Sequence, residues 1–103
     1  MRATLRKSIA FKDGTVWEAG QDVIIEVKET APMIAVLYRD GTPKRVRSAR
    51  LYYWFDEFIS FNMNDLEGAV MDCSCPSLTG AEIEPDGWDS EGFPSILLAA
   101  GVI

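Results

Sequence analysis

Two cysteines and a short run of carboxylates are the residues of this 103-residue chain whose types and spacing suggest chemistry. Cys73 and Cys75 supply two thiols one residue apart, whereas a structural zinc site normally needs four Cys or His ligands. The chain has no histidine, so it lacks the commonest general base and the usual partner of a cysteine nucleophile. We therefore expect two reduced cysteines, no metal site, no cofactor and no catalytic residues.

The run Glu82-x-Glu84-x-Asp86-Gly87 matches the first positions of a calcium-binding EF-hand loop. The twelfth position of such a loop needs a bidentate glutamate, and in this chain it is Phe93. The sequence also has no phosphate-binding loop and no dinucleotide-binding glycine motif. These patterns predict a binding protein and not an enzyme.

Charge is divided unequally between the two halves of the chain. Residues 1–50 hold all ten Lys and Arg residues and six Asp and Glu residues, a net charge of +4. Residues 51–103 hold ten Asp and Glu residues and no base, a net charge of −10. Two interpretations stay open: the halves neutralise each other in the fold, or a charged face stays exposed for a partner of opposite charge.

Hydrophobic alternation predicts a mainly β fold with short helices, of the α+β class. The segments with strand patterns are residues 3–11, 22–29, 33–39 and 43–51. Tight turns are expected at Asp13-Gly14 and Asp40-Gly41. Short strands at this spacing favour a small antiparallel SH3-like barrel over residues 1–61. Most of the aromatic side chains of residues 51–61 are expected in its core.

Residues 62–103 are expected to form an acidic helical and loop region that packs on the barrel, within a single domain of 103 residues. Asn64 and Glu67 have the spacing of a capping box and predict a helix over about 65–72. An acidic hairpin and loop follow. Pro94 then opens an apolar helix that Gly101 closes, and we expect this helix to dock into the core.

The last 39 residues contain an ordered series of turn, acidic and apolar residues. The series consists of Thr79, Gly80, Glu84, Pro85, Asp86, Gly87, Asp89, Gly92, Pro94, Ser95, Leu97, Leu98, Ala99, Gly101 and Ile103. It resembles the ending of small uncharacterised phage and prophage proteins, which tend to carry Trp where this chain has Ile96. Those proteins have no assigned activity, so the resemblance implies an origin and no mechanism.

The acidic half, the missing catalytic groups and the phage-like ending favour a non-enzymatic, phage-encoded interaction protein in the cytoplasm of a bacterial host. Its partner would be a host or phage protein with a basic surface. The most specific form is an inhibitor of a bacterial defence complex, such as an anti-CRISPR protein that mimics DNA. The predicted partner-binding residues are Glu82, Glu84, Asp86, Asp89 and Glu91.

Two alternatives stay open. A basic cluster beside aromatic residues would suit single-stranded nucleic acid, through Lys44, Arg45, Arg47, Arg50, Tyr52 and Trp54. A virion or assembly component would instead join the positive half of one subunit to the negative half of the next. No membrane partner is expected, because no apolar run reaches the length of a membrane span and the N-terminus has no signal-peptide pattern.

Overall fold

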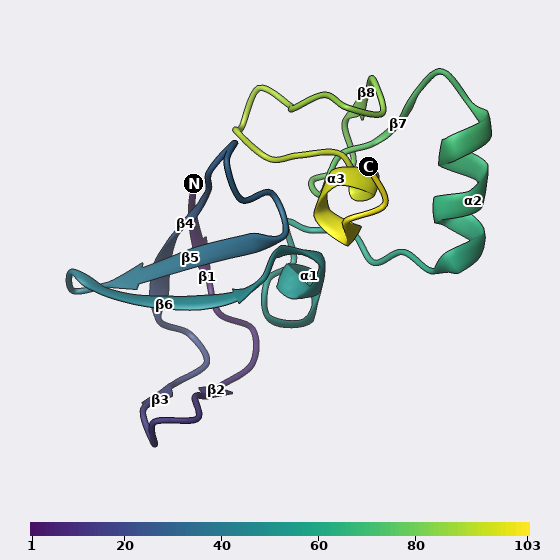
Figure 1. Cartoon of the computed structure of the whole chain (residues 1–103). Coiled ribbons are helices and arrows are strands. Elements are labelled where there is room, and N and C mark those ends of the chain that lie inside the picture. Colours follow the sequence, from purple (N-terminus) through teal and green to yellow (C-terminus); the bar gives the residue numbers. More distant parts are fainter.

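An antiparallel sheet forms the first half of the molecule in a computed structural model that describes residues 1–103 (Figure 1). Its strands, in spatial order, are β1 (Arg2–Thr4), β4 (Asp22–Val27), β5 (Ile34–Arg39) and β6 (Thr42–Arg47). Val23, Ile25 and Val27 alternate with exposed residues, as the sequence predicted for this strand. β5 lies between β4 and β6, with Ala35 and Leu37 fully buried. The mainly β, α+β class is confirmed.

A small hairpin leaves the sheet between β1 and β4. It consists of β2 (Ile9–Ala10) and β3 (Val16–Trp17). The predicted strand over 3–11 is therefore two strands, separated by exposed polar residues around Lys7. Trp17 is buried and meets Phe11 edge to face, with the ring centroids 5.0 Å apart. Trp17 is a member of the hydrophobic core cluster and Phe11 packs against it, so the Trp17 side chain anchors the hairpin to the core.

The predicted strand over 43–51 ends early, at Arg47. A single 3₁₀ turn, η1 (Ser48–Arg50), follows, and then the short helix α1 (Leu51–Trp54). Ser48 causes the change of direction: its N–H donates to the Met33 carbonyl and its hydroxyl donates to the Pro32 carbonyl. The Arg6 N–H then donates to the Trp54 carbonyl at 2.9 Å. The chain after β6 thus returns beside the end of β1, but β6 and β1 do not pair, so the predicted SH3-like barrel stays a prediction.

The helix α2 (Met63–Met71) begins two residues before the predicted start. Its N-cap is Asn62, so the prediction of Asn64 as the cap was wrong. The Asn62 side chain accepts from the Asp65 N–H at 3.0 Å, and the Asp65 carboxylate accepts from the Asn62 N–H at 2.9 Å. Aspartate at the third helical position takes the part that the sequence analysis gave to Glu67.

The C-terminal region consists of a two-stranded ladder and one more helix. These elements are β7 (Cys75–Pro76), β8 (Glu82–Ile83) and α3 (Ile96–Ala100). Ser95 caps the start of α3, and Gly101 ends it with a φ of 75°, a left-handed conformation that favours glycine. The helix contacts η1 and α2 and buries Ile96, Leu97 and Ala99. The predicted docking of this helix is confirmed.

One hydrophobic cluster links the sheet and the C-terminal region. The rings of Phe58 and Phe93 meet edge to face at 4.9 Å, and Phe55 lies beside Phe58. Both Phe55 and Phe58 are buried, whereas Tyr53 is 41% exposed. The other aromatic side chains of residues 51–61 are half-buried and pack against the cluster, so most of the segment lies in or against the core, as predicted.

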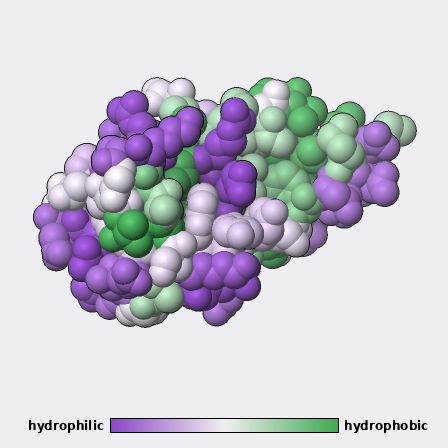
Figure 2. All heavy atoms as spheres, turned by 90° about the horizontal axis from the view of Figure 1, so that it is seen from below, coloured by the Kyte–Doolittle hydropathy of each residue, from purple (hydrophilic) through white to green (hydrophobic).

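The molecule is elongated, with extents of 41, 23 and 21 Å along its principal axes. The four-stranded sheet and the β2–β3 hairpin occupy one end and α2 the other (Figure 1). Figure 2 shows hydrophilic side chains over most of the left end and a larger hydrophobic area toward the right. None of the helices is both long and apolar enough to pass through a lipid bilayer.

Candidate functional site

The predicted acidic surface lies on β8 and on the loop that leads to α3. Glu82, Glu84, Asp86 and Glu91 are all exposed, and none lies within ion-pair distance of a Lys or Arg. We call these four residues the acidic surface. It continues toward α2, where Asp65, Asp72 and Glu82 line a hollow of about 410 Å³. The negative charge of this region is therefore available to a partner.

Asp89 was predicted to bind a partner, but in the structure its carboxylate bonds to the protein itself. Its Oδ2 accepts hydrogen bonds from the hydroxyls of Ser77 and Thr79, each at 2.6 Å. Its Oδ1 accepts from the N–H groups of Glu91 and Phe93, each at 2.9 Å. Both oxygens are thus occupied inside the protein. Asp89 organises the loop, and we leave it out of the acidic surface.

The hydrogen bonds of Asp89 also set its acidity. Burial acts to raise the pKa of this carboxyl, but the bonds from Ser77, Thr79, Phe93 and Glu91 outweigh it, and the pKa lies below its ordinary value. The carboxylate therefore stays charged at neutral pH inside the loop.

Further hydrogen bonds hold the acidic loop in one conformation. The Ser95 hydroxyl donates to the Pro85 carbonyl, and the Ser95 N–H donates to the Gly87 carbonyl at 3.1 Å. The Gly87 N–H closes the turn onto the Glu84 carbonyl at 2.8 Å. Trp88 and Pro94 form an isolated β-bridge. The exposed carboxylates are thus carried on an ordered scaffold.

The two halves of the chain share one direct ion pair. The Arg6 guanidinium lies 3.7 Å from the Asp56 carboxylate, and the two side chains are 41% and 80% exposed. The other ion pair, between Lys44 and Asp13, lies within the first half. The interpretation in which the halves neutralise each other through contacts therefore finds little support.

A basic groove lies between the β2–β3 hairpin and β6. The groove is open and has a volume of about 780 Å³. Its cationic lining residues are Lys12, Lys44, Arg45, Arg47 and Arg50, and its aromatic ones are Phe11 and Trp54. We call these residues and the space between them the basic groove.

Most of the basic groove was predictable from the sequence, but its hairpin side was not. The predicted residues that line the groove are Lys44, Arg45, Arg47, Arg50 and Trp54, and the lining also includes Lys12 and Phe11, which were not predicted. Tyr52 lies elsewhere, beside Arg6 in a smaller hollow. The only early signal for the hairpin side was the Asp13-Gly14 turn, which places Lys12 at a hairpin tip.

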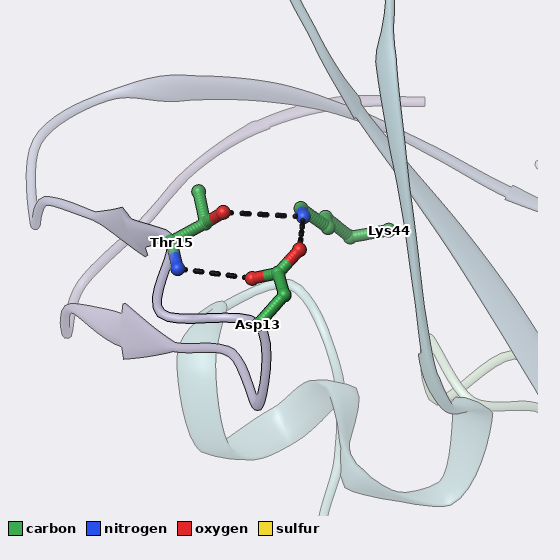
Figure 3. Close-up of polar contacts among 3 residues, drawn as sticks. All are labelled: Asp13, Thr15 and Lys44. Carbon is green, nitrogen blue, oxygen red and sulfur yellow. Dashed lines mark hydrogen bonds and ion pairs between the residues drawn. The ribbon is translucent and has the colours of Figure 1, made fainter.

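Lys44 and Asp13, which both line the groove, are in contact (Figure 3). The Lys44 ammonium donates to the Asp13 carboxylate and, at 3.4 Å, to the Thr15 hydroxyl. The second Asp13 oxygen accepts from the Thr15 N–H at 2.9 Å. The hydrogen bonds from Lys44 and Thr15 hold the pKa of Asp13 well below its ordinary value. This contact joins the hairpin to β6.

The register of β6 sends its basic residues to different sides. Lys44 is paired with the buried Leu37 and so lies on the core side of the sheet, at its rim. Arg45 and Arg47 are paired with Val36 and Ile34, so their side chains start on the other face of the sheet. Because β6 is an outer strand, both residues still line the groove, at the edge of the sheet, and both are exposed. Arg50 lies further along the chain, with its guanidinium carbon 6.0 Å from the Trp54 ring centroid.

The two cysteines are free thiols in unlike environments. Cys73 is exposed and Cys75 is buried. Burial raises the pKa of the Cys75 thiol, which stays protonated at neutral pH. No group of three or more Cys, Asp or Glu side chains is placed to hold a metal ion.

Comparison with protein-family models, with curated proteins and with solved structures found no match for this chain. The phage origin implied by the resemblance therefore stays a prediction.

Proposed function

We propose that the protein is a non-enzymatic binding protein whose acidic surface binds a basic surface on another protein. The observation that carries this proposal is the state of Glu82, Glu84, Asp86 and Glu91: all four are exposed, and none is paired with a cation of the same chain. A partner with Lys or Arg side chains would supply the missing counter-charges.

The ordering of the acidic loop supports this role. Binding normally costs free energy for each segment that must be immobilised, and a loop that is already ordered avoids part of that cost. Asp89 and Ser95 provide the order through their internal hydrogen bonds. Uncompensated charge on a fixed scaffold also accelerates association with an oppositely charged partner.

A host or phage protein in the bacterial cytoplasm is the partner that we propose. In the most specific form, the acidic surface enters a cationic cleft that otherwise holds DNA, as in a bacterial defence complex inhibited by a DNA mimic. The exposed, unpaired carboxylates are what would substitute for phosphates there. The resemblance of the ending to phage proteins supports the choice of compartment.

Pull-down from bacterial lysate tests the proposal with two variants of equal net charge. Glu84→Lys/Glu91→Lys reverses two charges of the acidic surface. Glu26→Lys/Glu29→Lys reverses two exposed charges of the sheet region and is the matched control. We expect the first variant to lose the captured partner and the control to retain it, with DNA competing for capture. The same partner captured by all three proteins would reject the proposal.

A further inference from the structure

We propose that the basic groove is a second binding site, and that its ligand is single-stranded nucleic acid. This site lies on the sheet region, and its charge is opposite to that of the acidic surface. It therefore goes beyond the binding of a basic protein and does not depend on it.

The charge of the groove is concentrated for a chain of net charge −6. Five cations and one carboxylate, Asp13, line it. Lys12, Arg45, Arg47 and Arg50 are exposed and have no carboxylate within ion-pair distance. A polyanion would therefore meet four unpaired cations, and its binding would release the counterions condensed on its phosphates.

The arrangement of these cations follows an extended line. Arg45 and Arg47 lie two residues apart on β6, so their Cα atoms are about 6.6 Å apart along the strand. β6 is an outer strand of the sheet, with β5 on one side only. Cations repeated along an outer strand suit a ligand whose charges also repeat along an extended backbone.

Two aromatic rings in the groove favour nucleic acid over other polyanions as the ligand. Phe11 and Trp54 are half-buried and line the same groove as the cations. Each ring is held from outside the groove: Phe11 meets Trp17, and Trp54 meets Tyr53 edge to face at 5.7 Å. Bases stack on such fixed rings, typically at about 1–3 kcal/mol per base. An acidic peptide would satisfy the cations and leave the rings unused.

The surrounding elements favour a single strand over a duplex. A protein that reads a duplex usually inserts a helix into the major groove. The helix beside the basic groove, α1, has only four residues, and α2 carries Asp65 and Glu67 and lies at the other end of the molecule. In a duplex the bases are also stacked on each other, so that Phe11 and Trp54 would find none to contact.

Fluorescence anisotropy with labelled oligothymidine tests the site. The titration is repeated between about 50 and 200 mM salt, because each phosphate contact to a single strand contributes about 0.7 to the slope of log affinity against log salt. Arg45→Gln/Arg47→Gln removes two exposed groove cations. Arg2→Gln/Lys28→Gln removes two exposed cations elsewhere and matches the change in net charge.

We expect salt-sensitive binding by the wild type. The Arg45/Arg47 variant should lose at least tenfold in affinity at the lowest salt, with a slope smaller by about 1.4, while the control keeps both values. Three results would overturn the proposal: no binding at low salt, equal losses in the two variants, or binding of duplex as tight as that of oligothymidine. Displacement by polyglutamate at charge concentrations equal to oligothymidine would also overturn it, in favour of an acidic peptide.

Discussion

Asp89 and Asp13 both have lowered pKa values. The cost in stability of replacing each one differs, because their surroundings differ. Asp13 is exposed at a hairpin tip, where Lys44 and Thr15 contact it. Asp89 lies partly buried among four donors. Its loss leaves those donors without an acceptor in a place that water reaches poorly, and this raises the cost of replacing it.

Asp89→Asn should destabilise the protein by about 1–3 kcal/mol at neutral pH, the usual cost of unsatisfied buried donors. The pKa of Asp89 in the folded state is below its unfolded value, so the carboxylate contributes stability above about pH 4. That contribution is lost as the pH falls through the folded-state pKa. Urea denaturation should therefore show a difference between wild type and variant that shrinks below about pH 4.

Glu91→Gln is the control for this prediction, because Glu91 is an exposed neighbour whose side chain has no hydrogen bond. Its free energy of unfolding should stay within about 0.5 kcal/mol of the wild type at neutral pH. If the Asp89→Asn difference were constant from pH 7 to pH 3, the charge of Asp89 would have no part in the stability of the loop.

The start of α2 shows how closely a helix boundary depends on one side chain. Asn62→Ala removes the side-chain half of the capping box, and we expect a loss of about 1 kcal/mol in the free energy of unfolding. Asn64→Ala should be neutral or slightly stabilising, because Asn64 lies inside the first turn and alanine is the better helix former there. Chemical denaturation of both variants measures the two effects. The opposite ranking would place the cap at Asn64 after all.

Elements with a clear hydrophobic period were predictable from the sequence, and those that depend on long-range contacts were not. The alternation of Val23, Ile25 and Val27 predicted β4, and the apolar run over 33–39 predicted the central β5. The end of β6 was not predictable, because it depends on Ser48 bonding to Pro32, 16 residues away in the sequence. Likewise α1 forms where four aromatic and apolar residues would locally favour a strand.

In each of the two charged surfaces, some residues were predictable from the sequence and others were not. Four of the groove cations are neighbours in the sequence, so their proximity followed from the chain itself. Lys12 and Phe11 join them only because the hairpin crosses toward β6, where Asp13 meets Lys44 across 31 residues. The structural use of Asp89 was hidden because nothing in an acidic run marks the one carboxylate that meets buried hydroxyls.

At the scale of the whole molecule, the separation of charge makes each copy a candidate partner for another. The acidic surface of one copy complements the basic groove of the next, and a contact of this kind is heterologous and does not close on two subunits. This is the assembly alternative raised by the charge split. Salt screens the attraction between exposed charges, with a Debye length of about 8 Å at physiological ionic strength.

Sedimentation velocity should therefore show self-association at low ionic strength that disappears at about 0.15 M salt. Glu84→Lys/Glu91→Lys should abolish the association, and the Glu26→Lys/Glu29→Lys control should retain it. A sedimentation coefficient that is independent of salt and protein concentration would exclude head-to-tail assembly. It would leave both proposed binding sites intact, since neither requires a second copy.

The three tryptophans lie in three separate parts of the molecule. Trp17 is buried in the hairpin, Trp54 lines the basic groove, and Trp88 is bridged to Pro94 in the acidic loop. Indole emission depends on the polarity around the ring, so each tryptophan is a built-in optical probe of its own region. Replacement of Trp54 or of Trp88 by Phe, with the buried Trp17 left in place, would show, without any attached dye, at which end of the molecule a ligand binds.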